Sequence, residues 1–259
     1  MRDGKVLEVH DIVLRFGGVT ALDGVSLDVD KGEILGLIGP NGSGKSSLLN
    51  CINGFYRPDS GKVYFEGKDI TRLPPYKIAQ LGISRTFQGI QLYIGMTTLQ
   101  NLLAGRHLKM KSNPLAAITY WPWVHREEVA HRRVVEDIID FLEIESVRNR
   151  VVGTLGYGLR KRVDLGRALA LEPKILLLDE PTAGMNVEEK GDMVRFILDI
   201  REAMHIPIVL VEHDMEIVMD IVDRAVVLDF GHTIAVGNPE AVRADPHVIK
   251  AYLGDEEGI

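Results

Sequence analysis

The feature that most constrains the fold is a short apolar run that leads directly into a glycine-rich loop and then a helix. Residues 34–38 are apolar, residues 39–44 read Gly-Pro-Asn-Gly-Ser-Gly, and Lys45-Ser46-Ser47 opens a segment with the apolar spacing of a helix. This is the pattern G-x-x-x-x-G-K-S between a strand and a helix, the setting in which it carries meaning. Consecutive backbone N–H groups of such a loop point inward at a polyphosphate, and the helix N-terminus adds positive potential. The sequence therefore predicts a nucleoside triphosphate site.

The predicted site consists of the loop and the three residues after it: Gly39, Pro40, Asn41, Gly42, Ser43, Gly44, Lys45, Ser46 and Ser47. We expect the Lys45 ammonium to reach the β- and γ-phosphates and the Ser46 hydroxyl to hold Mg²⁺. A chance glycine-rich turn is the alternative, and the strand and helix that flank the loop argue against it.

Composition narrows the class of protein. With 259 residues, of which 46% are hydrophobic, the chain can bury a substantial core as one large α/β domain or two small ones. A net charge of −7 argues against nucleic acid as the main partner. The single Cys51 excludes an intrachain disulfide and is expected to be a buried structural thiol. The sequence has no run of 18 apolar residues and no signal-like N-terminus, so we expect a cytoplasmic protein that reaches the membrane only through a partner.

Two groups of strands are predicted. Segments 6–16, 25–30 and 62–66 mix apolar and polar residues near period two, which favours an antiparallel layer. The runs 175–178, 208–211 and 225–228 alternate with helices that include 187–204, with Val194, Ile197, Leu198 and Met204 facing inward. This alternation predicts a mainly parallel sheet covered on both faces. A further strand is expected over 83–87, a hairpin turn and strand over 229–237, and a helical tail over 238–253.

Residues 96–171 have a helical pattern that is interrupted by a predicted loop over 106–126. The loop contains Trp121 and Trp123, and its apolar run is too short to cross a bilayer. It could lie against a membrane or a membrane subunit, but packing on its own helical region is favoured.

Acidic and polar residues follow three of the predicted strands. Asp179-Glu180 ends the strand 175–178, so Asp179 is placed to bind Mg²⁺ through water and Glu180 to deprotonate an attacking water. His213 follows another buried strand, where a γ-phosphate contact is favoured over a structural role. Gln88 also follows a strand and could complete the Mg²⁺ shell or sense the water.

These motifs occur together in a recognisable order. GPNGSGKS is followed by TFQ at 86–88, LGYGLRKR at 155–162, ILLLDEPTAGMN at 175–186 and VEHD at 211–214. Over nearly its whole length the chain resembles the ATP-binding subunit of ABC transporters. The segments 82–107 and 227–254, with the 106–126 insertion and the AGMN turn, look like the branched-chain amino-acid importer type, although importers of urea and of other amide or carboxylate solutes are built alike.

The resemblance implies roles for individual residues. Phe16 would stack on adenine, Gln88 would sense Mg²⁺ and water facing the permease, Glu180 would be the catalytic base and His213 the γ-phosphate switch. It also implies a P-loop (RecA-like) fold in one domain, 1–259, with a core and antiparallel layer over about 1–90 and 160–259 and a helical subdomain over about 91–159.

The signature motif departs from the family pattern Leu-Ser-Gly-Gly-Gln. Here the residues are Leu155-Gly156-Tyr157-Gly158-Leu159, so the serine and glutamine are missing, while the backbone N–H groups of Gly156, Tyr157 and Gly158 remain. Losing one hydrogen bond to a charged group costs roughly 1.5–3 kcal/mol if it is not replaced. The basic residues 160–162 could supply some positive field, or they could form a solvated helix face.

The resemblance therefore implies an ATPase that energises a branched-chain amino-acid importer, with ATP and Mg²⁺ bound between two cassettes, permease subunits as direct partners, a solute-binding protein as an indirect one, and the inner face of the cell membrane as its location. Three alternatives stay open: an importer of urea or a related solute, a non-transport ABC ATPase, and a nucleotide-dependent scaffold. The short interval between phosphate loop and signature, without heptads, argues against the chromosome-associated kind.

Overall fold

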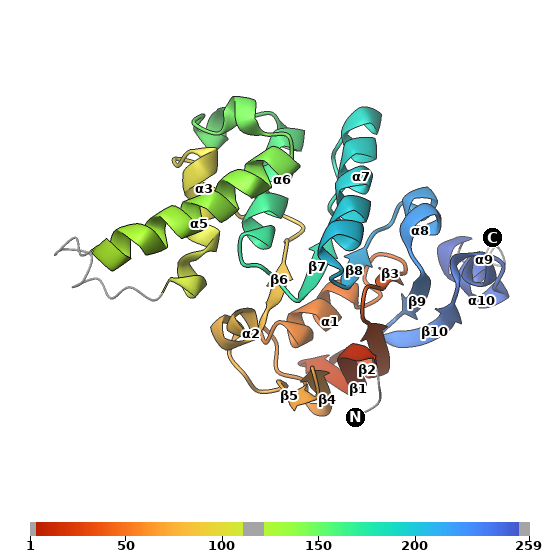
Figure 1. Cartoon of the computed structure of the whole chain (residues 1–259). Coiled ribbons are helices and arrows are strands. Elements are labelled where there is room, and N and C mark those ends of the chain that lie inside the picture. Colours follow the sequence, from red (N-terminus) through yellow and green to blue (C-terminus); the bar gives the residue numbers. More distant parts are fainter. Residues whose placement is uncertain (1–3, 111–121, 254–259) are drawn as a thin grey trace.

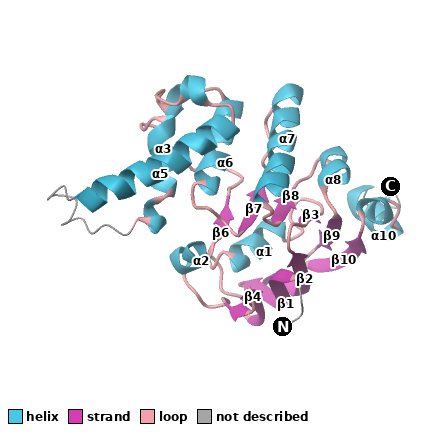
Figure 2. Ribbon diagram, in the orientation of Figure 1, coloured by secondary structure: helices cyan, strands magenta, loops and turns pink. Residues whose placement is uncertain are grey.

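The computed structural model describes residues 4–110 and 122–253, and its strands form two sheets (Figure 1, Figure 2). The antiparallel sheet has the order β2-β1-β4-β5 and consists of β1 (Lys5–Phe16), β2 (Val19–Asp30), β4 (Ser60–Phe65) and β5 (Lys68–Asp69). The second sheet has the order β10-β9-β3-β8-β7-β6 and consists of β3 (Ile34–Ile38), β6 (Ile83–Arg85), β7 (Ile175–Asp179), β8 (Ile208–Val211), β9 (Arg224–Asp229) and β10 (His232–Gly237). Within this sheet only the β9–β10 pair is antiparallel. The predicted fold class is confirmed.

The central strands of the second sheet are buried on both faces, as their unbroken apolar runs require. Every residue of β3, β7 and β8 is buried. Side chains of β3 alternate between two hydrophobic clusters: Ile34 and Ile38 belong to one, and Leu35 and Leu37 belong to the other. The first cluster includes residues of α7 (Val187–Met204) and α8 (Met215–Ile221), and the second includes α1 (Lys45–Ile52) and the antiparallel sheet.

The remaining helices lie at the two ends of the sheet. At the left of Figure 1, α3 (Thr98–Gly105), α5 (Pro122–Phe141) and α6 (Tyr157–Leu169) contact one another, with the 3-10 turns η1 (His107–Lys109), η2 (Glu145–Val147) and η3 (Val152–Thr154). The helix α2 (Pro75–Leu81) precedes β6, while α9 (Pro239–Arg243) and α10 (Pro246–Leu253) follow β10. None of the helices in the described ranges is long and apolar enough to cross a membrane. The division at residues 91 and 159 stays a prediction.

Four local predictions are wrong. The strand expected over 25–30 begins at Val19, because the first half of β2 pairs with β1 in a hairpin that places Phe16 opposite Val19. The strand expected over 83–87 ends at Arg85. The Thr86 amide still donates to the Leu177 carbonyl, and the chain leaves the sheet after that bond. Met204 is exposed rather than inward, because it is the last residue of α7.

The loop expected over 106–126 is the fourth wrong prediction. Residues 107–109 form η1, and α5 already begins at Pro122, because proline is tolerated in the first turn of a helix. Residues 111–121, which include Trp121, lie outside the described residues, so the proposed packing of this insertion stays a prediction.

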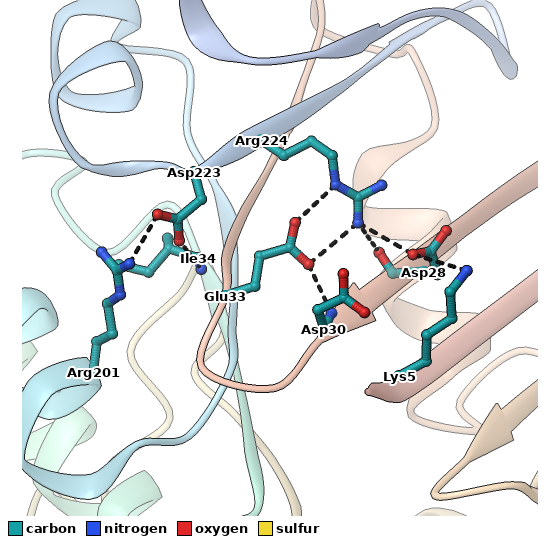
Figure 3. Close-up of polar contacts among 8 residues, drawn as sticks. All are labelled: Lys5, Asp28, Asp30, Glu33, Ile34, Arg201, Asp223 and Arg224. Atoms are coloured by element: carbon teal, nitrogen blue, oxygen red, sulfur yellow. Dashed lines mark hydrogen bonds and ion pairs between the residues drawn. The ribbon is translucent and has the colours of Figure 1, made fainter. Parts of the chain in front are cut away.

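Ion pairs join the two sheets at the edge where β3 and β9 begin (Figure 3). Arg224 donates from Nε to Glu33 Oε1 at 2.8 Å and from Nη2 to the Asp28 carbonyl at 2.7 Å. Close by, the Asp223 carboxylate accepts from the Ile34 amide at 2.8 Å and from Arg201 at 2.8 Å. The ends at which β3 and β9 begin are therefore held by structural contacts. The loops with the predicted phosphate-binding and catalytic residues follow the opposite, carboxyl ends of the parallel strands.

Candidate nucleotide-binding site

Three central strands end together at the carboxyl edge of the second sheet. In the parallel ladders Leu37 of β3 pairs with Val211 of β8, and Asp179 of β7 pairs with the same residue. The residues that follow these strands therefore emerge side by side, as predicted for a site at the carboxyl ends of parallel strands.

The phosphate loop follows β3, and two of its glycines are required by close packing. A Cβ on Gly39 would lie 2.0 Å from the Leu228 carbonyl oxygen, and Gly39 has φ 144°. A Cβ on Gly44 would lie 2.8 Å from the Ala21 carbonyl oxygen, and Gly44 has φ 108°. At Gly39 and Gly44 the loop is thus pressed against β9 and β2 in a conformation that only glycine adopts without strain.

Lys45 is the first residue of α1, and its ammonium lies inside the loop. Nζ donates to the carbonyl oxygens of Gly39 at 2.7 Å and Pro40 at 2.8 Å, and to Ser43 Oγ at 3.3 Å. Burial lowers the pKa of Lys45, while the charges of Glu180 and Asp179 act in the opposite direction. In the described part of the chain, the hydrogen-bond acceptors of Lys45 Nζ are all neutral, and such a buried cation is well suited to an anionic ligand such as a polyphosphate.

The predicted metal ligands fit Mg²⁺ by their chemistry. Asp179 is 2% exposed, and its Oδ2 accepts a hydrogen bond from Arg85 Nη2 at 2.6 Å. Its Oδ1 is buried without a hydrogen-bond partner among the described residues. Ser46 is exposed at the second position of α1. A hydroxyl and a free carboxylate oxygen are ligands of the kind that Mg²⁺ binds directly or through water.

Gln88 and Glu180, which are 92 residues apart in sequence, are brought together: Gln88 Nε2 donates to Glu180 Oε2 at 3.0 Å. Glu180 has φ 50°, a left-handed conformation that is uncommon for a residue with a side chain. The Lys161 ammonium, on α6, donates to the Glu180 main-chain carbonyl at 3.0 Å. Both the side chain and the backbone of Glu180 are therefore held by neighbouring elements.

His213 follows β8 by two residues, and Phe16 is the last residue of β1. His213 is 58% exposed, and its Nδ1 lies 3.9 Å from Glu212 Oε2. Glu212 is fully buried and accepts from the Thr182 amide and hydroxyl at 3.0 and 2.7 Å, so it fixes the turn that follows Glu180. Phe16 ends β1, is half exposed and packs edge-on against Tyr56 at 5.1 Å between ring centroids. The predicted nucleotide contacts of His213 and Phe16 stay predictions.

The signature residues open α6, with Gly156 as the N-cap and Tyr157 and Gly158 in the first turn. A Cβ on Gly158 would lie 2.2 Å from Glu189 Oε1, and a Cβ on Gly184 would lie 3.1 Å from the Tyr157 ring. The start of α6 is therefore packed against α7 and the turn before it. A Cβ on Gly156, by contrast, would meet no atom within 4 Å.

Two basic residues make contacts in the site that the sequence analysis did not predict. Lys161 is 4% exposed and burial lowers its pKa, so the interpretation of residues 160–162 as a solvated face is wrong at this position. Arg85, which contacts Asp179, was missed altogether. The available signal was a single charged residue in the otherwise apolar and small run GIS-Arg85-TF.

Comparison with known proteins identifies the family. A family profile described as "ABC transporter" matches residues 22–183, which span the phosphate loop, the signature and Glu180. The chain belongs to the ABC transporter family. A second profile, described as "Branched-chain amino acid ATP-binding cassette transporter", matches residues 232–258 of this cassette.

Curated relatives cover nearly the whole cassette. The high-affinity branched-chain amino acid transport ATP-binding protein BraF of Pseudomonas aeruginosa is 40% identical over 250 residues, which are 96% of this chain and 98% of that protein. The corresponding protein LivG of Escherichia coli is 36% identical over the same shares. A crystal structure of a nucleotide-free ATP-binding cassette superposes with a TM-score of 0.84 at 38% identity and covers 97% of this chain and 100% of that one. The predictions of an ATP-binding cassette and of ATP hydrolysis are confirmed by this family membership.

Proposed function

We propose that this cassette hydrolyses ATP to drive a membrane importer for branched-chain amino acids, working at the inner face of the membrane through its permease partners. The observation that carries this proposal is the relationship at 36–40% identity, over nearly full length, to proteins named as ATP-binding subunits for branched-chain amino acid transport. The match of residues 232–258 to a profile of the same transporter type supports it independently of the catalytic motifs.

In the proposed mechanism the phosphate loop and Lys45 hold the β- and γ-phosphates, and Phe16 stacks on adenine. Ser46 and Asp179 would hold Mg²⁺, which when bound would supply positive charge against the phosphate charge that develops during transfer. Glu180 accepts the proton of the attacking water, and its hydrogen bond from Gln88 at 3.0 Å supports this role, because it fixes the direction of the carboxylate. His213 is proposed to contact the γ-phosphate.

A second cassette is proposed to complete each site. The exposed residues Gly156 and Tyr157, with the first N–H groups of α6, would face the γ-phosphate held by the partner, and the turn 183–186 would cross the interface. Closure would exclude water and assemble the site, and hydrolysis would let the dimer open. The difference in ATP affinity between the closed and open forms can then do work on attached permeases.

The permease is proposed to dock in a groove whose lining includes Phe87, the residue before Gln88. Exposed aromatic residues support this choice: Phe55 and Tyr76 are each more than half exposed, and Phe55 packs edge-on against Phe87 at 5.7 Å. The groove is lined by residues that include Asn53, Phe55, Tyr76, Ala79, Arg85 and Phe87. Clustered apolar side chains beside a polar rim are typical of a surface that another protein covers.

The decisive experiment is solute uptake by vesicles that contain the cassette with its cognate permeases and binding protein. We expect ATP-dependent uptake of leucine, isoleucine or valine, and no uptake when Glu180 is replaced by Gln. Uptake of urea or another amide instead would identify a different solute. ATP-dependent dimerisation without hydrolysis, even with permeases present, would identify a nucleotide-dependent scaffold.

A further inference from the structure

We propose that Arg85 is a positioning residue for the magnesium site, which sets the separation between Ser46 and Asp179 by bridging the helix of one to the strand of the other. This inference rests on the proposed function, because it concerns the same site. The proposed role of Arg85 is indirect, because its guanidinium acts through Asn50 and Asp179.

The geometry of the Arg85 guanidinium carries the inference. Its Nη2 donates to Asp179 Oδ2 at 2.6 Å, and its Nη1 donates to Asn50 Oδ1 at 2.7 Å. Asp179 ends β7, whereas Asn50 belongs to α1. The side chains of Arg85 and Asp179 are only 5% and 3% exposed, so this bridge is shielded from competing water.

The position of Asn50 links the bridge to the second metal ligand. Asn50 follows Ser46 by four residues on α1, so the two side chains share one face of the helix. The Arg85 guanidinium is a rigid, planar fork of N–H donors. Because it binds Asn50 on one side and Asp179 on the other, it fixes the face of α1 that carries Ser46 relative to the strand that carries Asp179. Lysine has the same charge but lacks the planar fork.

The bridge also decides which oxygen of Asp179 is available. Arg85 engages Oδ2, and Oδ1 remains buried without a partner in the described part of the chain. The ion pair offsets part of the cost of burying the carboxylate, while one lone-pair-bearing oxygen stays free for a metal-bound water. Without the Arg85 guanidinium, the Asp179 carboxylate is free to rotate, and neither oxygen is reserved for the metal-bound water.

Arg85→Lys and Asn50→Ala test the proposal. Nucleotide affinity is measured in EDTA with a fluorescent ATP analogue, and the Mn²⁺ concentration that half-saturates the nucleotide complex is measured by electron paramagnetic resonance. Loss of an outer partner of a metal ligand typically weakens metal binding by about 10–100-fold, so we expect a shift of about 10-fold or more for Arg85→Lys. Nucleotide affinity in EDTA should change much less than Mn²⁺ affinity, because the Arg85 guanidinium contacts Asn50 and Asp179 rather than a residue of the phosphate loop.

Asn50→Ala keeps the Arg85–Asp179 pair and removes only the link to α1, so it decides the question even if Arg85→Lys does not fold. Arg224→Lys is the matched control, because this fork joins Glu33 and Asp28 at the opposite edge of the sheet. Unchanged Mn²⁺ affinity in Asn50→Ala and in any folded Arg85→Lys protein, or an equal shift in Arg224→Lys, would overturn the proposal. Failure of the unmodified cassette to bind MgATP would overturn the proposed function instead.

Discussion

Replacing Glu180 by Gln should trap the cassette as an ATP-bound dimer, and the structure shows why the rest of the site should survive the change. The Gln88 amide donates to Glu180 Oε2 at 3.0 Å, and the oxygen of a glutamine amide can accept the same bond. The other contacts use main-chain atoms: the Glu180 amide donates to the Val211 carbonyl at 2.9 Å, and the Glu180 carbonyl accepts from Lys161 at 3.0 Å and from the Ala183 amide at 3.3 Å. None of them depends on the carboxylate charge.

The expected decrease in the rate of ATP hydrolysis follows from the loss of a general base. Such a group contributes about 10²–10⁴-fold in rate, and each factor of ten corresponds to about 1.36 kcal/mol, so the barrier should rise by about 3–5 kcal/mol. Lys45 and the phosphate loop are untouched, so nucleotide affinity should be retained. ATP then persists long enough for the closed dimer to accumulate.

Phosphate release and size-exclusion chromatography with ATP test this expectation. The matched control is Glu33→Gln, the same chemical change at the opposite edge of the sheet, where Glu33 pairs with Arg224. We expect the control to hydrolyse ATP at the normal rate, even if it unfolds more easily. Normal turnover by Glu180→Gln would refute the assignment of the base, and slow turnover with weak ATP binding would assign Glu180 to binding rather than to catalysis.

Three further predictions concern Lys45, Gly156 and Cys51. Lys45→Ala should lower ATP affinity by about 10-fold or more, because a charged hydrogen bond is worth about 1.5–3 kcal/mol; unchanged affinity by calorimetry would contradict the phosphate-loop assignment. Gly156→Ser should tighten ATP-dependent dimerisation and Gly156→Ala should not, because a Cβ fits there without contact; identical sedimentation of the two would argue against a missing hydroxyl. Burial, with a smaller effect of the Asp59 charge, raises the pKa of Cys51 to about 12, so alkylation at pH 8 should require denaturant. Because the unfolded thiol ionises near pH 8.5, the free energy of unfolding should fall as the pH rises above about 9, which a pH series of denaturant titrations would measure.

The sequence predicted the features that depend on neighbouring residues. The phosphate loop is a local structure: its glycines, Lys45 and the flanking apolar runs are contiguous, so their order alone gave the site. The parallel sheet followed from apolar runs such as 175–178, because strands buried on both faces have no polar side. A helix at about 187–204 was predicted from its apolar residues, and α7 has these bounds, with Asn186 as its N-cap.

The features that the sequence did not predict depend on residues far apart in the chain. Arg85 and Asp179 are 94 residues apart, and only the pairing of β6 with β7 brings them together. Lys161 lies between two arginines, which is typical of a solvated helix face, but it is buried and its ammonium donates to the carbonyl of Glu180, 19 residues away in sequence. The first half of β2 was missed because its strand conformation comes from pairing with β1 rather than from its own alternation.

The atypical signature is easier to understand once its packing is known. Gly158 leaves no room for a side chain because Glu189 occupies that space, and Glu189 is itself held in the capping box of α7 by Asn186. Tyr157 lies against Gly184 in the turn before α7. The backbone at the start of α6 is thus fixed by its own chain, without the missing serine and glutamine. Because Gly156 and Leu159 replace the serine and the glutamine, we expect an anion at this helix start to be bound by the main-chain N–H groups of α6 rather than by those two side chains.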